Sequence, residues 1–221
     1  MDEFSTPAPV AAVVDVPAGR IRFTAAAQEV TTVQVAPADP SKGRDVKLAA
    51  QITATYADGV LRVQGPAGNR YFGSTGAVQL TVQLPSGSHV EAKAASAELV
   101  TEGPLGDVSF TGSQGPVSIG HATTARVAIA DGDVSIGRLD GDADLRTVRG
   151  NVMVSEAAGG TVVLRTEAGS IEVGTAAGVS AFLDASTVTG RIANALMNSG
   201  GTPALAIRAT AVTGDITARS L

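Results

Sequence analysis

The residues best suited to chemistry in this sequence are five aspartates that lie close together in its second half: Asp131, Asp133, Asp140, Asp142 and Asp144. Carboxylates gathered on neighbouring turns can bind calcium or act as paired acids. However, Asp140-x-Asp142-x-Asp144 lacks the glycine at position six and the glutamate at position twelve of an EF-hand loop. Because aspartates beside glycines are ordinary turn residues, the pattern predicts turns and no metal site.

The other candidates for catalysis are the two histidines, His89 and His121, and the serines of the repeated segments. Both histidines fit surface turns better than a metal site or a catalytic base. No base follows Ser109, Ser118 or Ser135 at a predictable spacing, so these serines are not activated nucleophiles. The absence of cysteine excludes thiol catalysis and zinc-thiolate sites. We therefore predict no catalytic, cofactor-binding or metal-binding residue, and no enzyme.

The charge of the chain narrows the classes of partner. A net charge of −5 disfavours binding to nucleic acid or to anionic membranes. The start, Met1-Asp2-Glu3-Phe4, is acidic, and the apolar run Val10–Val14 is too short for a signal peptide or a membrane span. We therefore expect a cytoplasmic protein without membrane insertion, or a cell-surface protein if the sequence is truncated and an export signal has been removed.

The elements that must position any site are short strands that repeat along the chain. A unit of the form Gly-x-Val-x-Ile recurs at a usual step of nine residues, with apolar third and fifth positions, which is typical of a strand buried on one face. The units begin at Gly106, Gly115, Gly132, Gly141, Gly150, Gly160, Gly169, Gly190 and Gly214.

A longer period separates a parallel solenoid from an antiparallel meander. Thr147, Thr166 and Thr187 each lie three residues before a unit glycine, whereas Arg138 and Ala157 occupy that place in the intervening units. Equivalent residues therefore recur about every 19 residues, as expected when coils of two strands stack and form a threonine ladder. We predict an all-β, right-handed parallel β-solenoid with about 18–19 residues per coil.

The chain divides into a less regular, β-rich part at 1–100, continuous with the regular repeats at 101–221. In the first part, Ala57-Asp58-Gly59 indicates a hairpin turn. Ser41–Gln51 is the one helical candidate, with Ser41 available as a cap, and we expect it to cap the first coil. Strands are predicted at Val10–Val16, Arg20–Thr24, Thr32–Ala36, Val60–Gln64, Val78–Leu84 and Val90–Ala94.

The period breaks at two places, Gly68–Gly76 and Ala195–Pro203. Since turns and core account for the periodic residues, binding is expected at these breaks. The first break groups bulky side chains and is either an interaction patch or a plug over the end of the coil. The candidate patch is Asn69, Arg70, Tyr71 and Phe72.

Several motifs give the sequence a resemblance that covers nearly the whole chain. They are the Gly-Asp-Val-Ser-Ile units and the stretches Val14–Ile21, Val82–Val90, Phe182–Ile192 and Val212–Thr217. With these motifs the chain resembles the bacterial putative-adhesin family of β-strand-repeat domains of unknown function, especially its actinobacterial members. The resemblance implies the fold, and it transfers no catalytic motif.

Two functions remain open from the sequence. The first is a non-catalytic structural or protein-interaction module, with an unknown protein partner or with another copy of the chain. The alternative is a carbohydrate-binding or polysaccharide-degrading β-helix protein, because extended solenoids often host such activities. With seven aromatic residues and no tryptophan, the chain offers few platforms for sugar rings.

Overall fold

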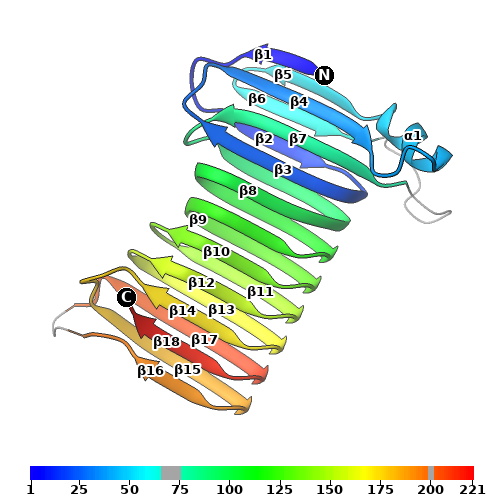
Figure 1. Cartoon of the computed structure of the whole chain (residues 1–221). Coiled ribbons are helices and arrows are strands. Elements are labelled where there is room, and N and C mark those ends of the chain that lie inside the picture. The colour runs from blue at the N-terminus through cyan, green and yellow to red at the C-terminus, as the bar shows by residue number, and fades with distance from the viewer. Residues whose placement is uncertain (66–75, 199–201) are drawn as a thin grey trace.

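The chain forms a flattened coil of strands stacked along one axis, with the N-terminal and C-terminal coils at opposite ends (Figure 1). The computed structural model describes residues 1–65, 76–198 and 202–221. In these ranges 18 strands form one continuous sheet, accompanied by one helix, α1, Gly43–Ala49. The first nine strands are β1 Asp2–Ser5, β2 Ala11–Asp15, β3 Ala18–Ala26, β4 Val30–Pro37, β5 Thr53–Ala57, β6 Val60–Gln64, β7 Val78–Pro85, β8 His89–Gln114 and β9 Val117–Asp131. The others are β10 Val134–Leu139, β11 Ala143–Arg149, β12 Val152–Ala157, β13 Gly160–Ala168, β14 Ile171–Thr175, β15 Ala181–Thr189, β16 Ile192–Ala195, β17 Leu205–Thr213 and β18 Ile216–Ser220.

Each coil gives one strand to each of two faces. Face A contains β16, β18, β14, β12 and β10 and continues through β3 and β7. Face B contains β15, β17, β13 and β11 and includes β2 and β6 further along. The long strands β8 and β9 pass around the edge of the coil and contribute residues to both faces.

The repeat length of the coils follows from the register on face A. Val117, Val134, Val152 and Ile171 lie side by side in parallel strands, so successive coils are 17, 18 and 19 residues long. These four side chains point inward and are at most 1% exposed. Each such burial contributes about 1.5–3 kcal/mol. The prediction of a parallel solenoid with two strands per coil is confirmed.

The threonine ladder is real, but its third member needs a correction. Thr147 lies beside Thr166, and the hydroxyl groups of both donate to the carbonyl oxygens of turn glycines, at 3.1 Å and 2.8 Å. Thr187 is not the next rung, because Ala211 lies between Thr166 and Thr187. The coil formed by β17 and β18 lies between the coil of β13 and β14 and the coil of β15 and β16. The outermost coil is therefore β15 and β16.

A similar exchange occurs at the N-terminal end. The coil β2–β3 lies between the coil β6–β7 and the first part of β8. Outside the coil β6–β7, β5 and β4 add antiparallel strands to the two faces, and β1 continues face A. The order of the coils in space therefore differs from their order in the sequence at both ends.

Most of the predicted N-terminal elements are present. Five of the six predicted strands occur with small shifts, and the sixth, Val90–Ala94, is the beginning of the much longer β8. The strands β1 and β5 are additions to the prediction. The hairpin between β5 and β6 turns at Asp58 and Gly59, both of which have positive φ, as predicted.

The helix is shorter than predicted and starts differently. Its N-cap is Lys42, which makes no side-chain capping bond. Ser41 instead donates from its N–H and its hydroxyl to Asp39, which lowers the pKa of Asp39 to about 2. The buried Asp45 anchors the helix by accepting N–H bonds from Asp39 and Ala77. The helix contacts β4 and β7 at one side of the coil (Figure 1), whereas we expected it to close the coil.

Candidate functional site

The predicted interaction patch, Asn69, Arg70, Tyr71 and Phe72, lies outside the described residues. At the second break of the period, the structure describes residues 195–198 and 202–203. They adjoin the outermost coil.

The clustered aspartates are used to join coils. Asp133 accepts the N–H and the side-chain amide of Asn151, at 2.7 Å and 3.2 Å. Asp142 accepts the N–H of Thr161 at 2.7 Å. Each bond links one coil to the next at the edge of the solenoid. These bonds give the aspartates that follow Gly132 and Gly141 a structural role at the turns.

The other three aspartates form ion pairs with arginine or histidine. Asp131 lies 2.9 Å from Arg149, and Asp144 lies 2.6 Å from Arg146. The bond from Arg146 lowers the pKa of Asp144. Within the part of the chain that the structure describes, no three histidine, aspartate or glutamate side chains are grouped as metal ligands.

The histidines also bond to aspartates at the edge of the coil. His121 Nε2 lies 2.7 Å from Asp140 Oδ2, and this bond lowers the pKa of Asp140. His89 Nδ1 accepts the N–H of Asp107 at 3.0 Å. Among the described residues neither histidine bonds to a serine or threonine hydroxyl, so this geometry offers no nucleophile paired with a base.

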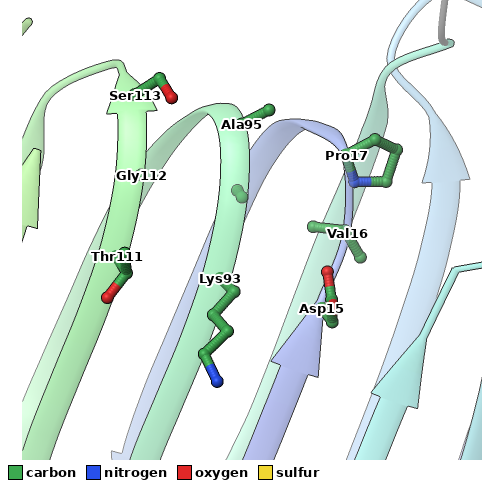
Figure 2. Close-up of a pocket in the computed structure, with 9 residues that line it drawn as sticks. Asp15, Val16, Pro17, Lys93, Ala95, Thr111, Gly112 and Ser113 are labelled. Atoms are coloured by element: carbon green, nitrogen blue, oxygen red, sulfur yellow. The ribbon is translucent and has the colours of Figure 1, made fainter. Parts of the chain in front are cut away.

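The described part of the chain contains two cavities at the surface. The first, of about 430 Å³, lies on face B and is lined by polar residues including Ser109, Arg126 and Asp144. The second, of about 320 Å³, follows three neighbouring turns at Pro17, Ala95 and Ser113 (Figure 2). In the second cavity, a bond to Glu91 raises the pKa of Lys93.

The two ends of the solenoid differ in how they close. At the N-terminal end, the Phe4 ring of β1 and the Tyr56 ring of β5 meet across the interior, with their centroids 5.8 Å apart. They occupy the position of a plug, a role that the sequence offers as one alternative for Tyr71 and Phe72, which lie outside the described residues. Both rings are half-buried and pack against the core.

At the C-terminal end, side chains that point into the interior of the coil are exposed to solvent. Ile192 occupies the same column as the buried Ile171 and Ile216, yet it is 46% exposed. Leu183 of β15 is only partly buried. On the outer side, Phe182 is 54% exposed and Val188 is 81% exposed. We call β15, β16 and their side chains the C-terminal end surface.

This surface was only partly visible in the sequence. The break at Ala195–Pro203 adjoins it, but β15 follows the same alternation as the buried strands. A signal in the sequence was the outward Phe182, at a position where β13 carries Thr161. Val188 gave no such signal, because β11 and β17 carry Val148 and Val212 at its position. The pattern could not show that this coil is outermost.

Two further comparisons concern membrane-spanning helices and similarity to known proteins. None of the helical structure described here is long and apolar enough to span a bilayer. No curated protein matches the sequence.

Solved structures resemble the whole chain at low sequence identity. A putative adhesin from Bacteroides fragilis is 14% identical with a TM-score of 0.50, over 98% of this chain and 95% of that chain. A putative adhesin from Parabacteroides distasonis is 14% identical with a TM-score of 0.45, over the same shares. A putative cell adhesion protein from Clostridium sporogenes is 12% identical with a TM-score of 0.43, over 100% and 98%.

The similarity to the Bacteroides structure concerns the fold alone. The sequence itself matches the family described as Toastrack DUF4097 over residues 13–219, nearly its full length. The predicted adhesin-like domain of unknown function is thereby confirmed, and the protein belongs to the Toastrack DUF4097 family.

Proposed function

We propose that the protein is a non-catalytic interaction module that binds a polypeptide partner through its C-terminal end surface. The observation that carries this proposal is the difference between the two ends. Phe4 and Tyr56 cover the interior at one end, while Ile192 and Leu183 leave it open at the other. Exposed apolar side chains that gather in one place are typical of protein interaction sites.

The chemistry of the rest of the surface agrees with a binding role. The aspartates and histidines that could act as acids or bases are engaged in coil-to-coil bonds. Among the described residues, six exposed large apolar side chains lie in the last coils, and five lie in the rest of the chain. The six are Phe182, Val188, Ile192, Met197, Val212 and Leu221. The related structures named as putative adhesins are consistent with binding to other molecules.

Site-specific photocrosslinking tests the proposal. A photoreactive phenylalanine analogue replaces Val188 on β15 or, as the control, Met153 on β12, which is 40% exposed on a middle coil. In extract of the native host, the Val188 variant should capture polypeptides at a much higher yield. Equal capture at the two positions would overturn the proposal.

The polar cavity on face B favours a second candidate, carbohydrate binding. It combines the hydroxyl of Ser109, the guanidinium of Arg126 and the carboxylate of Asp144 in about 430 Å³, groups that can bond to sugar hydroxyls. Glycan screening of the wild-type protein and of Arg126→Ala tests it. Binding that the substitution abolishes would support this function, and a clean negative with the wild-type protein would remove it.

A further inference from the structure

We propose that the partner is a second copy of this chain, joined end to end through β15 and β16 about a two-fold axis. This inference rests on the proposed function and names the occupant of the same surface. The axis runs perpendicular to the two faces and places each edge strand antiparallel to its own copy.

The hydrogen-bonding edges provide the first argument. Among the described residues, β15 pairs with β17 and β16 pairs with β18, and no third strand pairs with the outer side of either. At the start of β15 the Ala181 N–H donates to the Met197 carbonyl oxygen at 3.2 Å, so the open edge of β15 lies beyond Ala181. Open edges bind further strands unless charges, prolines or bulges block them. β15 and β16 contain no proline or lysine, and Asp184 is their only charged residue.

The shape of the end provides the second argument. An added single strand would cover β15 or β16, but not both faces and the interior between them. A second solenoid end with the same separation between its faces covers all three. The N-terminal end is a poorer match, because Phe4 and Tyr56 close its interior and β1 carries Asp2 and Glu3. The C-terminal end of a second copy has the same spacing between its faces, because a two-fold interface joins the same surface of both subunits.

Charge complementarity provides the third argument. Asp184 lies in the first half of β15, and Arg191 lies just beyond the turn that ends this strand. Both side chains are exposed, and neither carboxylate nor guanidinium has an ion-pair partner among the described residues. Antiparallel self-pairing brings the start of one β15 beside the end of the other. Each Asp184 then faces the Arg191 of the copy, and symmetry forms this pair twice.

Light scattering coupled to size-exclusion chromatography of the full chain tests this arrangement. The wild-type protein should elute with twice its monomer mass of 22.0 kDa and dissociate on dilution. Asp184→Arg or Arg191→Asp alone places like charges together and should weaken the dimer about tenfold, given two exposed pairs. The double variant restores opposite charges and should recover the wild-type affinity. A wild-type monomer at every concentration, or a double variant no better than either single variant, would overturn the inference.

A control variant and a second measurement distinguish loss of the dimer from misfolding of a variant. Glu167→Arg makes the same change of charge on β13, away from the end, and should leave the dimer intact. Hydrogen exchange of the wild-type protein should show that β15 amides lose protection on dilution, while β12 amides do not. Protection of β15 that is independent of concentration would contradict the dimer.

Failure of this inference is distinguishable from failure of the proposed function. If the Val188 photocrosslinker captures other polypeptides while the chain remains monomeric, the end surface binds a different partner and only the second copy is refuted. If the Val188 variant captures nothing above the Met153 control, the proposed function itself fails.

Discussion

Replacing Gly150 by alanine should destabilise the solenoid far more than replacing Gly59. Gly150 lies in a column of turn glycines with Gly132 and Gly169, and its φ is +147°. A Cβ atom at Gly150 would lie 2.0 Å from the carbonyl oxygen of Gly132 in the neighbouring coil. Carbon atoms approach carbonyl oxygens to about 3.3 Å, so the two coils would have to separate by more than about 1 Å.

This separation of the coils determines how much unfolding free energy the substitution removes. The coils are joined at this turn by N–H bonds of 2.8 Å from Gly132 to Arg149 and 2.9 Å from Val134 to Asn151. Both bonds would become too long, at a cost of about 1 kcal/mol each. Backbone strain at positive φ adds about 1–3 kcal/mol. We expect Gly150→Ala to lose about 3–5 kcal/mol of unfolding free energy.

Gly59→Ala is the matched control, because Gly59 also has positive φ (+78°) but no atom lies within 4 Å of its added Cβ. It should cost only about 1–2 kcal/mol from strain. Urea unfolding followed by circular dichroism compares the two variants. Equal losses would show that strain alone accounts for the turn glycines, and would refute the argument from coil contact.

Four further predictions concern the core, a pH effect, the helix and cooperativity. Thr101→Val should raise the melting temperature, since the buried Thr101 hydroxyl has no hydrogen-bond partner among the described residues and its removal gains about 1 kcal/mol; an unchanged or lower value contradicts this. The bond from His121 lowers the pKa of Asp140 in the folded protein, so its stabilisation is present above the unfolded value near 4 and is lost as the pH falls through the lowered value. Asp140→Asn should therefore be less stable than wild type at pH 6, with the difference vanishing in acid; a difference independent of pH would refute the assignment. Asp45→Ala leaves two backbone N–H groups without their acceptor and should cost about 2–3 kcal/mol, with faster hydrogen exchange confined to the N-terminal end. The irregular and regular parts of the chain are expected to unfold as one unit, and two separate urea transitions would contradict this.

The sequence by itself determined the strands, the turns and the parallel stacking. The alternation in each unit specifies which side chains enter the interior, and the turn glycines mark where each strand begins. The 19-residue recurrence of Thr147 and Thr166 predicted their adjacency, which the register confirms. These features depend on neighbouring residues or on a fixed repeat length, so they can be predicted from a single sequence.

The order of the coils was decided only by the tertiary structure. Thr187 follows Thr166 in the sequence pattern, yet Ala211 lies between them in space. Apart from Phe23 and Phe110, most inward side chains are aliphatic residues of similar size, so the pattern of one coil does not specify its neighbours.

The candidate site depends on that order. Ile192 has the same type and place in its repeat as Ile171 and Ile216, and it is exposed only because no described coil lies beyond it. The closure of the opposite end by Phe4 and Tyr56 likewise requires two strands from different faces to meet. Sequence periodicity therefore determined the coil, whereas long-range stacking determined which coil forms its open end.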